Sequence, residues 1–117
     1  MSDQLLDLVE FKERVQDDID LLLELLDIFV ADYVGKRKAL EEAVSKKDFD
    51  QLKSVAHSLK GASGNISAKN LREVLIKLEE MGKSNDLSSA GATLAQLDEA
   101  YQALEKRIDE VKQELKK

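Results

Sequence analysis

Apolar residues recur in steps of three and four along most of this chain, with charged residues between them. This spacing places the apolar side chains on one face of an α-helix, so it predicts a protein built from amphipathic helices. The two longest stripes predict one helix from about residue 18 to Lys46 and another that begins near Leu87. Their apolar members are Ile19, Leu22, Leu23, Leu26, Phe29, Val30, Tyr33, Leu40 and Val44, then Leu87, Ala90, Leu94, Leu97, Tyr101, Leu104, Ile108, Val111 and Leu115.

Three further helices complete the expected pattern. The first carries Leu5, Leu6, Leu8 and Val9 and ends near Val15; the second is capped by Asp48 and ends near Ile66; the third carries Leu71, Val74, Leu75, Leu78 and Met81 between connections at 67–70 and 82–86. Because the connections are short, neighbouring helices should be antiparallel. We therefore expect an all-α, antiparallel up-down-up-down four-helix bundle with a short extra N-terminal helix. It forms a single domain over 1–117, with its core at about 18–112.

Three apolar residues lie off the stripe of the first long helix. Leu21, Leu25 and Ile28 fall roughly 120–160° away from it on the helical wheel. They form a second apolar patch, which another part of the protein should cover. We expect the N-terminal helix to cover it; a docking partner is the functional alternative, and both could share the patch.

Composition excludes several classes of protein. The chain has a formal net charge of −6 and no cysteine, so it has neither a disulfide framework nor a thiolate metal site. Its lysines are scattered rather than clustered, which argues against binding to nucleic acid. No apolar stretch is long enough to span a bilayer. We expect a soluble, cytoplasmic domain that contacts neither nucleic acid nor membrane.

The only histidine lies in the most unusual stretch of the chain, residues 56–64, which also holds two of the five glycines. On a helical wheel His57, Lys60, Gly61 and Gly64 share one polar face. Each glycine inside a helix costs about 1 kcal/mol relative to alanine, and this pair leaves the space around the imidazole bare. A neutral imidazole is a nucleophile at physiological pH, and a nearby ammonium suits a product that carries phosphate charge. The face has the chemistry of a phosphorylatable histidine.

Each of these residues also has a simpler interpretation. A single histidine on a polar helix face is usually only solvated, and a lysine is ordinary on such a face. The glycines could instead mark close packing of two helices, and Gly64-Asn65 could cap the end of the helix.

The segment His57-Ser58-Leu59-Lys60-Gly61-Ala62-Ser63-Gly64 resembles the His-x-x-Lys-Gly signature of histidine-containing phosphotransfer (HPt) domains. The similarity extends over about residues 20–108, and its other matching positions are Leu26, Phe29, Leu40, Ala43, Asp48, Leu52, Leu71, Leu78, Glu79 and Gly82. The resemblance implies a four-helix bundle whose exposed histidine accepts a phosphoryl group from a receiver-domain aspartate and passes it to another.

The resemblance also points to two residues on the following helix. In HPt proteins a glutamate or glutamine at the position of Glu79 often contacts the histidine ring, and some members have a basic residue at the position of Lys83. Carried over, Glu79 would accept the Nδ1 proton of His57 and leave Nε2 free to attack. The alternative for Glu79 is an ion pair with Lys83, four residues later on the same helix.

The function expected from this resemblance is that of a phosphorelay carrier. His57 is the phosphoacceptor, Lys60 neutralises the phosphoryl group, and Gly61 and Gly64 admit the partner. The partner is a response-regulator receiver domain, a hybrid histidine kinase, or both. The chain lacks a nucleotide-binding glycine loop, so we expect no kinase activity of its own. We expect no cofactor on this chain, with the divalent metal on the receiver, and a monomeric protein.

Two other interpretations remain open at this stage. The chain could be the phosphoacceptor domain of a chemotaxis-type histidine kinase, which an ATP-binding domain elsewhere phosphorylates. It could also be a structural helical bundle or dimerisation module, in which case His57 would be dispensable.

Overall fold

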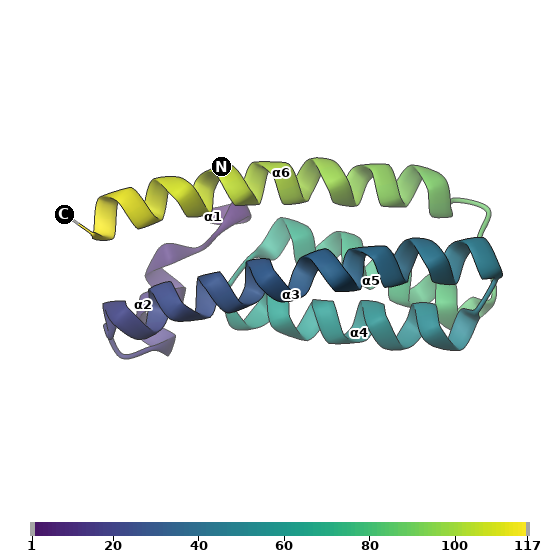
Figure 1. Ribbon diagram of the computed structural model, residues 1–117, viewed down its shortest axis with the longest axis horizontal. Coiled ribbons are helices and arrows are strands. Elements are labelled where there is room, and N and C mark those ends of the chain that lie inside the picture. The colour runs from purple at the N-terminus through teal and green to yellow at the C-terminus, as the bar shows by residue number, and fades with distance from the viewer. Residues whose placement is uncertain (1, 117) are drawn as a thin grey trace.

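The structure, a computed structural model, describes the backbone of residues 2–116 and the side chains of residues 4–116. Over this range it is helical (Figure 1). The helices are α1 (Ser2–Leu5), α2 (Leu8–Arg14), α3 (Ile19–Lys46), α4 (Phe49–Asn65), α5 (Lys69–Ser84) and α6 (Ala90–Leu115). The prediction of an all-α fold is confirmed.

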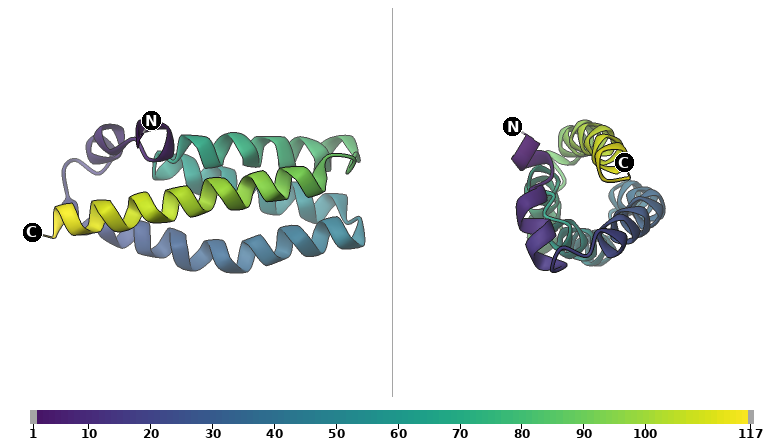
Figure 2. Two further views of the ribbon diagram at one scale, coloured as in Figure 1. Left: turned by 90° about the horizontal axis from the view of Figure 1, so that it is seen from above. Right: turned by 90° about the vertical axis from the view of Figure 1, so that its left-hand side faces the viewer.

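The four long helices α3 to α6 run alternately up and down and pack side by side as an antiparallel bundle (Figures 1 and 2). The bundle is elongated, with principal extents of 46, 21 and 20 Å. Leucines dominate its interior, among them Leu22, Leu26, Leu40, Leu52, Leu59, Leu71, Leu75, Leu78, Leu97 and Leu104. Each such buried side chain contributes about 1.5–3 kcal/mol relative to an exposed one. In the part of the chain that the structure describes, no helix has the length and apolar character needed to cross a membrane.

The N-terminal region differs from the prediction, because two short helices replace the single one expected. The chain breaks between α1 and α2 at Asp7, whose side chain caps α2 by accepting a hydrogen bond from the Glu10 backbone N–H. Aspartate competes with continued helix in this way. The Asp7 backbone N–H also donates to the Ser67 carbonyl, so the break is fixed by a contact with the α4–α5 turn. The N-terminal segment lies at one end of the bundle (Figure 2), and its Leu6 and Phe11 are buried in the core.

The expected cover for the second apolar patch is absent. Among the residues described, Leu21 is 40% exposed and Ile28 is 55% exposed, while Leu25 is partly buried against the core. Helix α2 instead directs Phe11 into the core. The prediction that the N-terminal helix covers this patch is therefore wrong for Leu21 and Ile28.

A polar residue in a left-handed backbone follows the ends of three helices; α3 and α4 end at Lys46 and Asn65, close to the predicted Lys46 and Ile66, whereas α5 extends beyond its predicted end. Lys47, Ser67 and Asn85 have φ of 57°, 61° and 55° and lie just beyond the ends of α3, α4 and α5. The connection after α4 is consequently shorter than expected, and α5 continues through Gly82 to Ser84. Segment 82–86 is thus mostly helix rather than loop. No glycine among the described residues has positive φ, so Gly64-Asn65 is not a glycine cap.

Candidate functional site

Helix α4 presents His57 to solvent because of how its two faces are built. Asp48 caps the helix by accepting a hydrogen bond from the Gln51 backbone N–H at 3.0 Å, as the sequence predicted. The buried face of α4 consists of Leu52, Ala56, Leu59 and Ser63. His57 lies off that face, and its side chain is 68% exposed.

Helix α5 supplies a carboxylate to this ring. Glu79 Oε2 lies 2.8 Å from His57 Nδ1, which is the contact that the HPt resemblance implied. The Glu79 side chain is only 7% exposed, so the surrounding packing restricts its position. A buried partner thus fixes the orientation of an exposed ring.

Two lysines keep Glu79 charged. Lys60 Nζ lies 2.6 Å from Glu79 Oε1, and Lys83 Nζ lies 3.9 Å from Oε2. The hydrogen bond from Lys60 is the main cause that lowers the pKa of Glu79, against the opposing effect of burial. An ionised carboxylate only accepts hydrogen bonds, so Nδ1 of the neutral ring must be the donor. The lone pair of that neutral ring is then on Nε2.

Lys60 and Lys83 differ in how closely they approach this carboxylate. Lys60 bonds directly to Glu79 through the oxygen that does not hold the ring, and its side chain is 23% exposed. Its neutralisation of a phosphoryl group on the ring stays a prediction. The pairing of Glu79 with Lys83, the alternative considered from the sequence, is present only as a long contact beside the bond to His57.

The two glycines that follow His57 have different surroundings. A Cβ added at Gly61 would meet nothing within 4 Å, so the space beside this residue is open, as predicted. A Cβ at Gly64 would lie 3.5 Å from Arg72 Nε, and the Gly64 carbonyl accepts a hydrogen bond from Arg14. Gly64 is therefore less open than Gly61. Neither of these glycines packs against the backbone of another helix.

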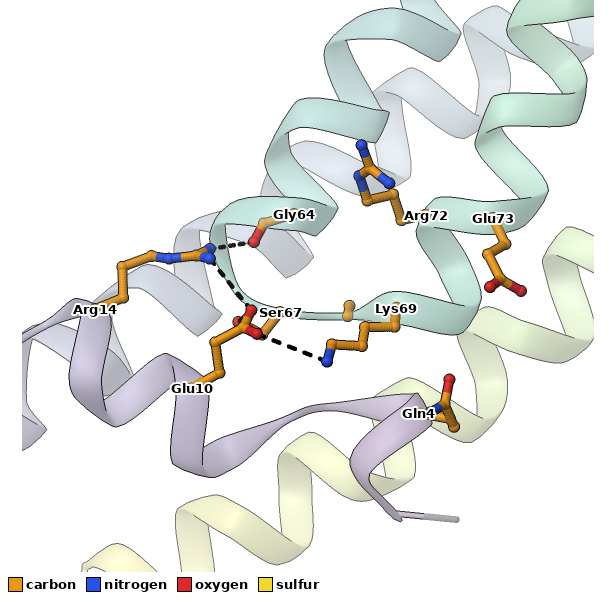
Figure 3. A pocket seen from close by; sticks show the side chains of 9 residues that line it. Gln4, Glu10, Arg14, Gly64, Ser67, Lys69, Arg72 and Glu73 are labelled. Carbon is orange, nitrogen blue, oxygen red and sulfur yellow. Dashed lines mark hydrogen bonds and ion pairs between the residues drawn. The ribbon is translucent and has the colours of Figure 1, made fainter.

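A pocket of about 380 Å³ lies beside the end of α4, where α1, α2 and α5 meet (Figure 3). Three of its charged groups pair: Glu10 lies 3.2 Å from Arg14 and 3.6 Å from Lys69, and Lys69 also pairs at 2.9 Å with Asp7, outside the pocket lining. Ser67 Oγ donates to Glu10 at 2.7 Å. Gly64 lines the pocket, and His57 does not. The ion pairs and hydrogen bonds around the pocket hold the N-terminal helices and do not involve the ring.

The sequence interpretation missed two groups near the site. Arg14 comes from α2, and its contact with Gly64 joins residues 50 positions apart, which no helical spacing reveals. Lys36 on α3 donates to Ser58 Oγ at 2.8 Å, one residue after His57. Among the side chains described, no three histidine, aspartate or glutamate residues come together as a metal site.

Comparison with known proteins agrees with this geometry. The Hpt domain family model matches residues 24–107. The chain is 26% identical over 104 residues to histidine-containing phosphotransfer protein 2 of Arabidopsis thaliana, which covers 85% of this chain and 67% of that protein.

Two solved structures share the fold. Histidine-containing phosphotransfer protein B (HptB) from Pseudomonas aeruginosa superposes with a TM-score of 0.79 and 28% identity, over 92% of this chain and 90% of that one. Histidine-containing phosphotransfer protein MtHPt2 from Medicago truncatula has a TM-score of 0.71 and 22% identity, over 83% of this chain and 69% of its own, and supports the fold alone. By its family match, its helical bundle and its signature around His57, this chain belongs to the Hpt domain family of phosphotransfer carriers.

Proposed function

We propose that this chain is a phosphorelay carrier in which His57 accepts a phosphoryl group and passes it on. The donor is a receiver-domain aspartyl phosphate or a hybrid histidine kinase, and the acceptor is a second receiver aspartate. The observation that carries the proposal is the exposed imidazole whose Nδ1 is bonded to the ionised Glu79. That arrangement leaves Nε2 as the nucleophile, on a side chain that is 68% exposed to solvent and to a partner.

The transfer step follows from this arrangement. The Nε2 lone pair attacks phosphorus, the N–P bond forms, and the P–O bond to the aspartate breaks to release a carboxylate. The Nδ1 proton stays on the ring, and the positive charge that develops there is stabilised by Glu79 at 2.8 Å. The reverse reaction returns the phosphoryl group to an aspartate, so the chain needs no further reactant.

Positioning and charge neutralisation provide most of the catalysis in phosphoryl transfer. Lys60 contributes one ammonium close to the ring, three residues from His57, and Lys83 is a more distant second cation. In this proposal Lys60 shares its charge between Glu79 and the phosphoryl oxygens. The divalent metal is held by the receiver, and this chain supplies no cofactor.

A surface that includes part of the helix carrying His57 suits a partner protein. Gly61 is open, and a shallow apolar pocket of about 130 Å³ lies between α3 and α4, lined in part by Leu25, Ile28 and Ala62. Ile28 is 55% exposed at this pocket. We propose that the receiver docks here, so that its aspartyl phosphate meets Nε2. In this proposal the chain acts as a cytoplasmic monomer without kinase activity.

Phosphotransfer with purified proteins tests the proposal. The chain is mixed with receiver domains that carry radiolabelled aspartyl phosphate, and in parallel with histidine-kinase cores and ATP. We expect label that is acid-labile and base-stable on the wild-type chain after incubation with a receiver, and none on His57→Gln. Label that persists in His57→Gln, or no label from any receiver, would contradict the proposal. Label from a kinase core and ATP alone would favour a chemotaxis-type phosphoacceptor domain instead.

A further inference from the structure

Helices α4 and α5 pass very close to each other at Gly82. A Cβ built on Gly82 would lie 2.7 Å from the backbone nitrogen of Lys53 and 2.9 Å from its Cα. Carbon atoms in good contact are about 3.5–4.0 Å apart, so a side chain here would force the two backbones to separate. Gly82 is buried within α5 and its φ is not positive, so the position requires space rather than conformational freedom.

This close approach lies one helical turn from the bond between Glu79 and His57. Glu79 precedes Gly82 by three residues on α5, and His57 follows Lys53 by four on α4. Because the two helices are antiparallel, both pairs lie along the same α4–α5 seam, by which we mean the contact surface of these two helices (Figure 1). The spacing at Gly82 therefore sets the distance that the Glu79 side chain has to span.

The hydrogen bond between Glu79 and His57 would be lost if α4 and α5 moved slightly apart. Glu79 Oε2 and His57 Nδ1 are 2.8 Å apart, and hydrogen bonds beyond about 3.5 Å no longer fix a partner. Glu79 is buried and its other oxygen is held by Lys60 at 2.6 Å, so it cannot simply swing outward. A separation of the backbones at Gly82 would be passed on to this bond.

We propose that Gly82 is a positioning residue for His57: its missing side chain lets α5 approach α4 closely enough for Glu79 to hold Nδ1. The effect on phosphoryl transfer rests on the function proposed above. The effect on the ring itself does not, because the tautomer of His57 is observable in the unphosphorylated protein.

Substitution of Gly82 by alanine tests this directly, with Gly35→Ala and Gly91→Ala as matched controls. Both control glycines are helical and have nothing within 4 Å of an added Cβ. In wild type and controls, the ring-nitrogen NMR shifts of His57 should report one dominant tautomer, with the proton on Nδ1. In Gly82→Ala they should move toward the mixture of a free imidazole, and transfer from a phosphorylated receiver should slow by about tenfold.

A double-mutant cycle distinguishes an effect on the positioning of His57 from a general disturbance of the fold. In a Glu79→Ala background, Gly82→Ala should cause no further loss of transfer, because the bond that it disturbs is already gone. To keep the variant folded, Gly82→Ala is placed in a Gly35→Ala, Gly91→Ala background, which favours the helices. An unchanged His57 tautomer in folded Gly82→Ala would overturn the inference, as would an equal loss of transfer in both backgrounds. A tautomer that shifts in a chain that accepts no phosphoryl group would overturn only the proposed function.

Discussion

The α4–α5 seam and the contact between α3 and α6 are closed in opposite ways. At the first, a glycine allows the backbones to approach and a buried carboxylate reaches an exposed ring. At the second, the rings of Tyr33 and Tyr101 stack at 3.8 Å with an interplanar angle of 5°. The α4–α5 seam therefore depends on backbone spacing, whereas the α3–α6 contact depends on side-chain bulk.

The polar groups of the two contacts are also used differently. Arg37 and Asp98 form a two-point ion pair between α3 and α6, at 2.7 and 2.9 Å, beside the tyrosine stack. The hydroxyls of Tyr33 and Tyr101 are buried without a hydrogen-bond partner among the described residues. In contrast, Glu79 engages His57 and Lys60 at the same time. At α3–α6 the contact is one of packing and ion pairing, while at α4–α5 it orients the His57 ring.

The largest expected effect is on stability, from removing the stack. Tyr33→Ala should lower the free energy of unfolding by about 3–5 kcal/mol, as for other buried aromatic residues, while His57 stays oriented wherever the variant is folded. Tyr33→Phe is the matched control. It keeps the ring and removes an unpartnered hydroxyl, so it should be neutral or stabilising. Denaturant unfolding measures both, and a large loss in Tyr33→Phe would contradict this account of the contact.

The next effect is on transfer. Glu79→Ala should slow phosphoryl transfer to His57 by about 10- to 100-fold, by analogy with the loss of a group that orients a metal-binding imidazole. The neighbouring exposed residue gives the control, and Glu80→Ala should leave the rate unchanged. Single-turnover transfer from a phosphorylated receiver measures both. Equal rates in the two variants would show that Glu79 does not orient the ring.

The two contacts should also respond at opposite ends of the pH scale. Burial raises the pKa of Tyr101 to about 12, and that of Tyr33 is raised as well. Their contribution to stability is complete below pH 10, the ordinary tyrosine value, and is lost as the pH rises through the folded-state values. Unfolding followed by circular dichroism should coincide with the ultraviolet absorbance of tyrosinate. Tyrosinate that forms in a chain still fully folded would contradict it.

The lowered pKa of Glu79 predicts how stability responds to acid. Its pKa is lowered, chiefly by Lys60, so its contribution to stability is present above its ordinary pKa of 4.5 and is lost as the pH falls through the lowered value. NMR of the side-chain carboxyl should show Glu79 titrating below the ordinary glutamate pKa of 4.5. Titration at or above that value would mean that Lys60 does not hold this carboxylate.

The smallest effect is expected at Gly61. Gly61→Ala should raise the free energy of unfolding by up to about 1 kcal/mol through helix propensity, because the added methyl meets nothing. Under the proposed docking it should still slow transfer, since the methyl would project into the surface proposed for the receiver. Gly35→Ala should give a similar gain in stability with no change in transfer. If both variants transfer equally, the open surface at Gly61 is not needed for docking.

The long helices and the contact between His57 and Glu79 were both accessible from the sequence. Periodic apolar positions predict α3 and α6, because a helix with one buried face carries apolar residues at regular intervals of three and four. The partner of the ring was found from the HPt resemblance, which placed a carboxylate on the next helix. The direct bond from Lys60 to Glu79 was not foreseen, since it depends on how two helices pack.

The remaining features could not be predicted from the sequence, because they depend on contacts between residues that are far apart along the chain. Gly82 precedes a polar run and was interpreted as part of a loop, yet it lies buried against Lys53 in the preceding helix. The break at Asp7 is fixed by the backbone of Ser67. Ile28 was expected to be covered, but α2 directs its one buried residue elsewhere. Local patterns report which face is buried, and they do not report which partner buries it.

The exposure of the imidazole would limit the lifetime of a phosphoryl group bound to it. A ring that is 68% open to water offers little protection to a phosphoryl group on its outward nitrogen. For the proposed carrier, the stored group would survive only as long as a phosphohistidine survives in bulk solvent, and for a shorter time in acid. The waiting period between donor and acceptor would then be limited by spontaneous hydrolysis, and the acceptor has to be encountered within that lifetime.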